Sequence, residues 1–259
     1  MRERMTTHPA NHYFDLIRNL EYPFFPGAIF PSEMALFLYS CDGAGVAAII
    51  ESGRQDGYST AVLASYGDVR GIPVISIDIE VDHQRAQVAR ERLARFKTLE
   101  VRRGNSYRMI PRVLLNLPGP VALLIDGPKE HDAIYLSAAA AAFGSVGLVA
   151  HHNTEPGSRW HPHFIARFGE AGFFEESDLA RDPDAPGFRQ WERDFTRDTN
   201  RDLAQTSLAI ARLSPERPKL RHLRGPNAWH TLNATSLYLS WRVGLAFMPV
   251  MLLRRFQWL

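Results

Sequence analysis

The chain has 259 residues, of which 45% are hydrophobic and 22% charged, so it can bury a sizeable core in one large α/β domain. Its formal net charge is only +2 and it has no long block of lysine or arginine, which argues against a nucleic-acid partner. Cys41 is the one cysteine, so no disulfide can form within the chain, and we expect a reducing, cytoplasmic location.

Apolar runs rich in β-branched residues alternate with helical patterns, which is typical of a parallel sheet with crossover helices. We therefore predict a Rossmann-like, doubly wound α/β fold, with a mostly parallel seven-stranded sheet and helices on both faces. In chain order, the expected elements are a helix at 32–40, a strand at 47–51, a helix at 58–66, a strand at 74–79, a helix at 82–96, strands at 99–103 and 121–126, a helix around 135–143, a strand at 147–150, and weaker strands at 173–176 and 207–213.

The chain is expected to have three parts. Residues 1–45 hold N-terminal helices and an aromatic, proline-rich loop that either shapes a pocket wall or covers the core. Residues 46–213 form the Rossmann-like domain, with a polar surface insertion at 180–202. Residues 214–259 form a C-terminal extension. Residues 1–10 are charged and polar, so we expect no secretory signal.

The extension ends in an apolar, amphipathic tail at 236–259. Its uncharged run at 243–253 is too short to span a bilayer, which needs about 20 apolar residues. Tryptophan and arginine side chains flank this run, as in segments that lie on a membrane surface. Two interpretations stay open. The tail docks on the protein's own core or on a second subunit of a homo-oligomer, or it contacts the inner face of a membrane.

The first expected strand runs into a glycine-bearing turn, where a doubly wound sheet binds its ligands. Gly53 lets the backbone turn tightly and approach a ligand, and Gly57 permits close contact between helix and strand. Ser59 offers a hydroxyl near a helix N-terminus. Because Gln55 occupies the middle position, this is not the G-x-G-x-x-G dinucleotide fingerprint. A plain strand–helix turn is the alternative interpretation.

Polar side chains also follow the second and third expected strands. Asp78 lies about 20 residues after the first turn, where an acid accepts the ribose hydroxyls of a nucleoside. Ser106 lies in a polar turn that can contact an adenine edge. The alternatives are a surface carboxylate and an ordinary turn.

Chemically active side chains follow the fourth and fifth strands as well. Asp126 can hold a metal or an amino group, and Lys129 can deprotonate or orient an acceptor hydroxyl. His152 and Asn153 can be metal ligands, with Asp126 on the neighbouring strand. The alternatives are an Asp–Lys surface pair and structural histidines.

Together these residues resemble class I S-adenosylmethionine-dependent methyltransferases. The resemblance is greatest to the metal-dependent O-methyltransferases of the catechol and caffeoyl-CoA type and to the cephalosporin hydroxylase-like group. It covers 32–153 and the expected strand at 207–213, and the first turn, E-S-G-R-Q-D-G-Y-S, follows the family pattern E-x-G-x-x-x-G-Y-S. The residues that this resemblance assigns to the S-adenosylmethionine site are Glu51, Gly53, Gly57 and Ser59 at the methionine part, Asp78 at the ribose, Ser106 beside the adenine, and Asp126.

The resemblance also implies a metal site that this chain departs from. Asp126 matches the family's metal ligand and Lys129 its base or orienting cation, but His152-Asn153 stands where the family has an Asp-Asn or Glu-Asp pair. A hard cation prefers carboxylates. Either a softer divalent metal binds to Asp126, His152 and Asn153, or the site has lost its metal and His151 or His152 serves as the base.

The function predicted from the sequence is S-adenosylmethionine-dependent O-methylation of a small molecule or sugar hydroxyl, with Lys129, Asp126 and His152 as catalytic residues. An acceptor with adjacent oxygens, such as a catechol or a vicinal diol, suits such a site. Two other hypotheses remain. One is a non-catalytic methyltransferase-fold subunit or scaffold in a membrane or protein complex, which the histidine-for-acid change and the apolar tail suggest. The other is a nicotinamide-dependent oxidoreductase, which the missing dinucleotide fingerprint argues against.

Overall fold

The computed structural model describes four stretches of the chain. Lys129 and the whole extension at 214–259, with its tail at 236–259, lie outside them. The described residues are 9–127, 130–141, 146–196 and 207–213. Their elements are α1 (Ala10–Arg18), α2 (Pro31–Gly43), β1 (Ala48–Ser52), α3 (Tyr58–Arg70), β2 (Val74–Asp78), α4 (His83–Leu93), β3 (Leu99–Arg103), α5 (Ser106–Leu114), β4 (Val121–Ile125), α6 (Glu130–Ala141), β5 (Val146–His151), α7 (His161–Phe168), the 3-10 helices η1 (Phe174–Glu176) and η2 (Asp178–Arg181), α8 (Ala185–Thr196) and β6 (Ala209–Arg212).

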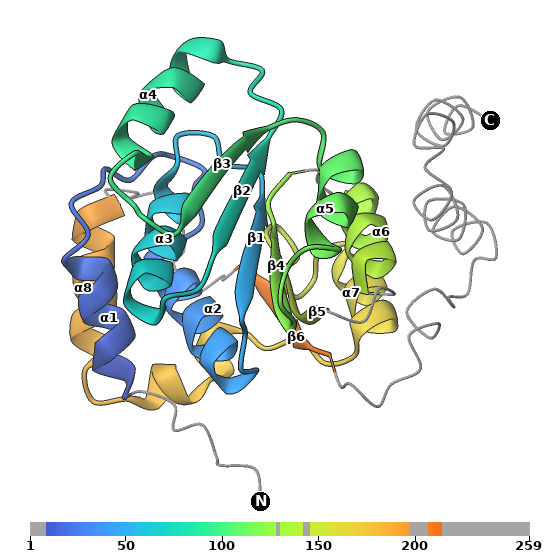
Figure 1. Ribbon diagram of the computed structural model, residues 1–259. Coiled ribbons are helices and arrows are strands. Elements are labelled where there is room, and N and C mark those ends of the chain that lie inside the picture. The colour runs from blue at the N-terminus through green and yellow to red at the C-terminus, as the bar shows by residue number, and fades with distance from the viewer. Residues whose placement is uncertain (1–8, 128–129, 142–145, 197–206, 214–259) are drawn as a thin grey trace, which may run out of the picture.

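In the described part of the chain, the strands form a six-stranded sheet in the order β3-β2-β1-β4-β5-β6 (Figure 1). β1 to β5 are parallel, and β6 runs antiparallel to β5. The chain winds outward from β1 to β3 and then returns to β4 on the other side of β1. The predicted Rossmann-like, doubly wound fold is confirmed, and its switch point lies between β1 and β4.

One expected strand is replaced by a turn. The prediction at 207–213 is met by β6, but 173–176 forms the 3-10 helix η1. Gly172 makes a single antiparallel bridge to Ile210 of β6. Where a seventh strand was expected beside β6, the described chain therefore pairs through this one residue. The hydroxyl of Ser177 donates to the carbonyl of Phe174 at 2.6 Å. This local bond favours the turn over further pairing with β6.

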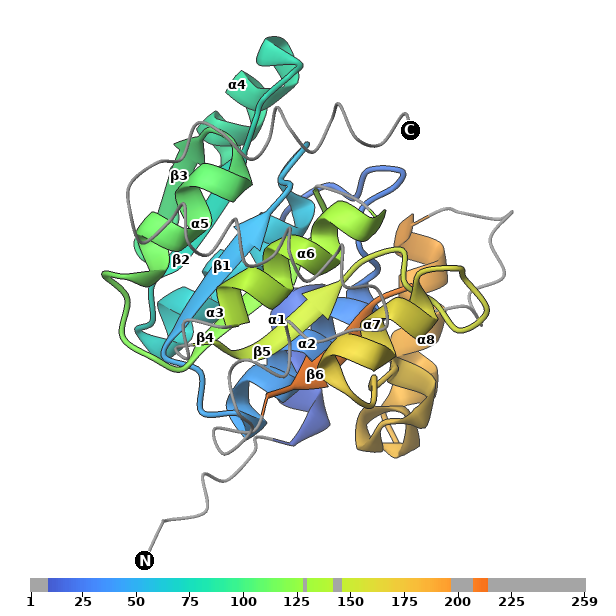
Figure 2. The ribbon, with the colours of Figure 1, turned by 90° about the vertical axis from the view of Figure 1, so that its right-hand side faces the viewer.

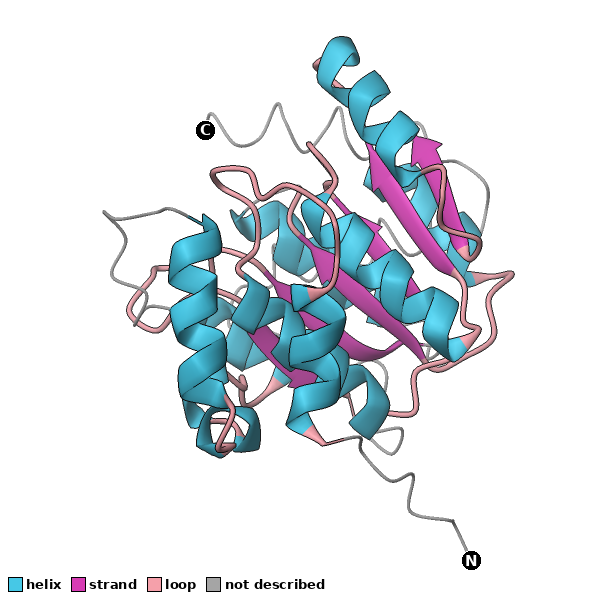
Figure 3. Ribbon diagram, turned by 90° about the vertical axis from the view of Figure 1, so that its left-hand side faces the viewer, coloured by secondary structure: helices cyan, strands magenta, loops and turns pink. Residues whose placement is uncertain are grey.

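Helices cover both faces of the sheet. Figure 2 shows α5, α6 and α7 against one face, and Figure 3 shows the opposite face, which α1, α2, α3 and α8 cover. Alternate residues of β1 enter the two cores. Ile49 packs on the side of α1, α2, α3 and α8, and Ile50 packs on the side of α5, α6 and α7. Among the described helices, none is long and apolar enough to cross a membrane.

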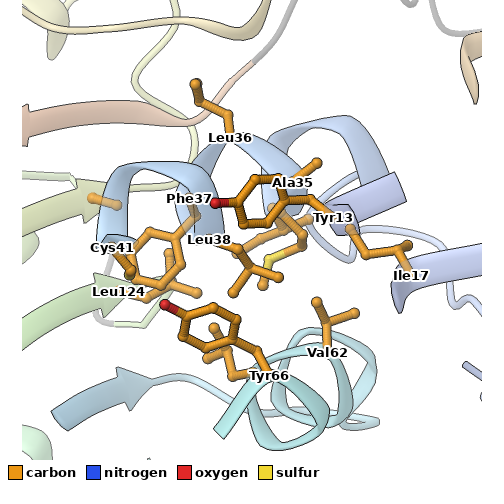
Figure 4. Packing of buried hydrophobic residues seen from close by; sticks show 14 of the residues in the cluster. Tyr13, Ile17, Ala35, Leu36, Phe37, Leu38, Cys41, Val62, Tyr66 and Leu124 are labelled. Carbon is orange, nitrogen blue, oxygen red and sulfur yellow. The ribbon is translucent and has the colours of Figure 1, made fainter. Parts of the chain in front are cut away.

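The N-terminal helices share the core of the sheet. In Figure 4, Tyr13 of α1, Phe37 of α2 and Tyr66 of α3 gather in one buried cluster. The buried carboxylate of Asp42 accepts hydrogen bonds from the hydroxyls of Tyr13 at 2.6 Å and Tyr66 at 2.7 Å, and it pairs with Arg70 at 2.8 Å. Three helices are therefore joined by one polar group inside an apolar layer.

A second buried carboxylate fixes the approach to β6. Glu33 of α2 accepts the backbone N–H of Phe30 at 2.9 Å and of Leu208 at 2.9 Å, and the N–H and hydroxyl of Ser207. Glu33 is 1% exposed, so water cannot replace it as the acceptor. Glu33 thereby contacts Ser207 and Leu208, which lie 174 and 175 positions later in the chain.

We expect Glu33→Ala to lower the free energy of unfolding by about 3 kcal/mol or more, because several buried N–H groups lose their acceptor. Urea unfolding followed by circular dichroism measures the loss. Glu100→Ala, at an exposed glutamate of β3, is the control and should change stability by less than about 1 kcal/mol. Equal effects of the two substitutions would contradict the role given to Glu33.

Candidate functional site

A cavity of about 480 Å³ lies at the carboxyl ends of the central strands. Its walls come from the turn after β1, the end of β2 and the residues up to the start of α4, the start of α5, and the turn after β4. This is the switch-point edge at which doubly wound sheets bind ligands. Four of the predicted site residues line it together: Gly53, Asp78, Ser106 and Asp126.

The turns after β1 and β4 touch at Gly53. A Cβ on Gly53 would lie 2.6 Å from the backbone nitrogen of Gly127, and the φ of Gly53 is +94°. The carbonyl of Ser52 accepts the N–H groups of Asp126 and Gly127, each at 2.8 Å. The glycine is therefore required for contact between the two turns, and this contact brings Asp126 to the cavity.

Asp78 organises the rim of the cavity. Its Oδ2 accepts the N–H of Arg54 at 2.7 Å and of Gln55 at 3.1 Å, and its Oδ1 accepts the N–H of Glu80 at 2.5 Å. A carboxylate has about four acceptor positions, so about one remains for a ligand. Asp78 thus has room to accept one ribose hydroxyl, where the sequence suggested both.

Glu51 lies beneath the turn and does not line the cavity. It is fully buried and accepts hydrogen bonds from the hydroxyls of Ser59 at 2.5 Å, Ser76 at 2.6 Å, and Thr60. Burial raises the pKa of the Glu51 carboxyl, and the three hydroxyls oppose that shift. Glu51 and Ser59, both expected at the methionine part of the cofactor, contact each other here and support the turn from below.

Gly57 also lies outside the cavity lining. It precedes α3 with a φ of +88°, and a Cβ there would lie 2.6 Å from the hydroxyl of Tyr22. That hydroxyl donates to the carbonyl of Asp56 at 2.7 Å. The aromatic loop that precedes α2 therefore packs against the first turn through Tyr22, which sequence reasoning did not single out.

Ser106 begins α5 at the cavity wall. Its hydroxyl lies 2.5 Å from that of Ser52, and Asn105 caps the helix by accepting the N–H of Tyr107 at 2.9 Å. Tyr107 lines the cavity together with Ile79 and Val81, which are 56% and 81% exposed. An aromatic ring and exposed apolar side chains in one cavity suit a nucleoside base.

Asp126 and His152 form a buried pair at the edge of the cavity. Oδ1 of Asp126 lies 2.6 Å from Nδ1 of His152, and their side chains are 9% and 1% exposed. Nε2 of His152 is buried and has no hydrogen-bond partner among the described residues. His152 is not part of the cavity lining, but a carboxylate that holds one imidazole nitrogen fixes the orientation of the ring, as in histidines that act as general bases.

The donor set around Asp126 does not match a preformed metal centre. Oδ1 of Asp126 and Nδ1 of His152 are hydrogen-bonded directly to each other, so these two atoms do not converge on a third point. Asn153, the third expected ligand, is exposed and has a φ of +61°. No group of three or more His, Cys, Asp or Glu side chains that could hold a metal ion occurs among the described residues. The geometry therefore favours an oriented histidine at this place.

His151 belongs to the core. It is 1% exposed, its Nε2 lies 2.6 Å from the hydroxyl of Ser137, and its ring makes edge contacts with Phe164 and Phe168. Burial lowers the pKa of His151 to about 3, so the ring is neutral at physiological pH. Of the two histidines weighed as a base, His152 is the one that contacts a cavity residue.

The charge of the cavity is predominantly negative. Its lining includes Asp78, Asp82 and Asp126, and also Glu80, whose buried carboxylate pairs with Arg54 and Arg90. Among the described lining residues, Arg85 is the one cationic side chain, and it pairs with Asp56. A site of this kind attracts a cation and repels phosphate groups.

Solved O-methyltransferases resemble this structure. They include an O-methyltransferase from Bacillus cereus in complex with SAH (19% identity over 79% of this chain and 90% of that one, TM-score 0.43), the O-methyltransferase TomG from Streptomyces achromogenes, involved in tomaymycin synthesis, in complex with SAM (17%, 79% and 89%, 0.43), and a putative caffeoyl-CoA O-methyltransferase from Staphylococcus aureus (16%, 80% and 93%, 0.42). No protein-family model and no curated protein matches the chain. At these identities and TM-scores, an activity has to be argued from the chain's own residues.

Glu51→Gln tests the burial of the carboxyl beneath the turn. A carboxyl with a raised pKa in the folded state stabilises the protein most below its unfolded pKa of about 4.3, and this contribution is lost as pH rises through the folded pKa. Glutamine does not titrate. We therefore expect the variant to gain stability relative to the natural chain as pH rises from 4 to about 7, measured by urea unfolding. A difference that stays constant over this range would contradict the raised pKa.

Proposed function

We propose that this protein is an S-adenosylmethionine-dependent methyltransferase that methylates a hydroxyl of a small molecule. The observation that carries the proposal is the acidic cavity at the switch point, where carboxylates from the ends of β2 and β4 meet exposed apolar side chains. S-adenosylmethionine is a nucleoside whose sulfonium is cationic. Such a ligand matches both the charge of the cavity and its apolar walls.

The same site argues against a nicotinamide dinucleotide. A dinucleotide places its pyrophosphate on the backbone N–H groups of the first turn. Here the N–H groups of Arg54 and Gln55 already donate to Asp78. The neighbouring carboxylates would also repel two phosphate charges.

Four cavity residues suit the parts of the cofactor. We propose that Asp78 accepts a ribose hydroxyl, that Ile79 and Tyr107 flank the adenine, and that Asp126 faces the methionine end. The bound cofactor supplies a methyl group activated for displacement by an oxygen nucleophile. The protein holds donor and acceptor in line, and such positioning can contribute roughly 7–11 kcal/mol in favourable cases.

His152 is the proposed base. Asp126 holds Nδ1 of the imidazole, and Nε2 takes the proton of the acceptor hydroxyl as the oxygen becomes nucleophilic. We propose no step through a metal, because Asp126 and His152 bond to each other. Lys129, outside the described residues, is proposed to orient the acceptor oxygen. Catechols and sugars remain the proposed acceptors.

Binding of S-adenosylhomocysteine, the demethylated cofactor, tests the site directly. We expect calorimetry to show binding to the natural protein and at least about tenfold weaker binding to Asp78→Asn, because a hydrogen bond to a charged acceptor is lost. Asp178→Asn changes an exposed aspartate outside the cavity and is the control. Absence of binding to the natural protein would refute the proposal, and enhanced NADH fluorescence on mixing would favour the dinucleotide instead.

Replacement of His152 tests the base. We expect His152→Gln to lower kcat by about 10²- to 10⁴-fold with catechol or sugar acceptors, while its affinity for S-adenosylhomocysteine stays unchanged. The kcat for a nitrocatechol, which is already ionised at neutral pH, should fall much less. His163→Gln, at an exposed histidine of α7, is the control.

Two results would overturn this role. If activity disappears on dialysis against EDTA and returns with a divalent ion, His152 is a metal ligand and not the base. Binding of the cofactor without turnover of any acceptor in the natural protein would favour the non-catalytic subunit.

A further inference from the structure

A buried ion pair beside the cavity has no part in the proposed chemistry. Arg54, in the turn after β1, and Glu80, just after β2, have side chains that are 0% and 2% exposed. Nη2 of Arg54 donates to Oε1 of Glu80, and Nη1 donates to the carbonyl of Ser76 at 3.2 Å. We call this pair the Arg54–Glu80 clip.

Stability alone gives a poor account of the clip. Burying two charges costs desolvation energy that their attraction often fails to exceed, and apolar residues in the same place are frequently as stable. Nε of Arg54 is also buried without a hydrogen-bond partner among the described residues, which adds to the cost. A costly polar pair next to a ligand cavity points to a role in holding a particular geometry.

The clip joins two strained turns. Gln55 has a φ of +46° and Glu80 a φ of +53°, which residues with side chains rarely adopt. Both residues line the cavity, and both donate their backbone N–H to Asp78. Such conformations persist only where surrounding contacts enforce them. The clip supplies such a contact, because it ties the residue before Gln55 to Glu80 itself.

The second oxygen of Glu80 extends the clip to a third element. Oε2 accepts from Arg90 of α4, and Nε of Arg103 on β3 lies 4.0 Å away. The same helix contributes Arg85 and Ala86 to the cavity wall. One buried carboxylate thus connects the turn after β1, the end of β2 and α4, which together form much of the cavity.

We propose that Arg54 and Glu80 are positioning residues that hold the two turns around Asp78 in the conformation that binds the nucleoside, so that cofactor affinity depends on a buried ion pair. The proposal deepens the proposed function and rests on it for the identity of the ligand. It predicts that the two residues act through each other.

The experiment compares three variants. Glu80→Gln and Arg54→Met each remove one charge, and the double variant R54M/E80Q removes both, so it leaves no uncompensated buried charge and is expected to fold. Arg90 is partly exposed and can turn to solvent in that variant. The matched control is R102M/E100Q, at an exposed ion pair on β3 outside the cavity.

Two measurements are made on each protein: amide hydrogen exchange by NMR without ligand, and calorimetry with S-adenosylhomocysteine. We expect the amides of Arg54, Gln55 and Glu80 to exchange about tenfold faster in the clip variants, with the amides of β1 and β4 unchanged. Affinity should fall about tenfold in each single variant and no further in the double variant, since partners in one network are not additive.

The double variant decides the proposal. If it folds and keeps both the exchange rates of the three amides and the affinity within twofold of the natural protein, the clip has no positioning role. If the loss of affinity in the double variant equals the sum of the losses in the two single variants, the claim that the residues act through each other is also overturned. If the natural protein binds no S-adenosylhomocysteine, the proposed function fails, and the exchange rates alone still decide whether the clip holds the turns.

Discussion

The contact between the turns after β1 and β4 determines where every group of the site lies. The backbone of Gly127 approaches Gly53 so closely that no side chain fits on Gly53, and the carbonyl of Ser52 accepts two N–H groups from the β4 turn. The backbones of neighbouring parallel strands thereby end at one place, with Asp126 directed to the cavity. Asp78 repeats this arrangement on the β2 side, where a carboxylate takes the place of a carbonyl as the shared acceptor.

Much of this could be predicted from the sequence because buried parallel strands have a recognisable pattern. Runs of buried β-branched residues mark β1, β2 and β4, and the residue after each run must lie at the carboxyl edge of the sheet. Asp78 and Asp126 were found in this way. Glu51 shows the limit of such reasoning, because it ends the same kind of run but does not reach the cavity. Side chains alternate along a strand, and that of Glu51 lies beneath the loop after β1, where three hydroxyls surround it.

Other features could not be predicted because they depend on contacts between distant residues. In the sequence, Arg54 and Glu80 look like solvated charges in two separate polar segments, and only the folded chain shows that both are buried. The expected strand at 173–176 has an apolar pair that suits a strand, yet a hydroxyl bond from Ser177 closes it into a turn. The expected metal ligands Asp126 and His152 are adjacent, as the strand order required, but they bond to each other.

The negative lining of the cavity has a consequence for turnover under the proposed function. Donation of the methyl group leaves a neutral thioether where a sulfonium cation stood, so the attraction between the sulfonium and the carboxylates ends with the reaction itself. The spent nucleoside keeps its apolar and ribose contacts and the contacts of its amino-acid end, but it has lost the charge of the sulfonium. A pocket built in this way discriminates by charge between fresh and used cofactor, and it lowers the extent to which the enzyme is inhibited by its own product.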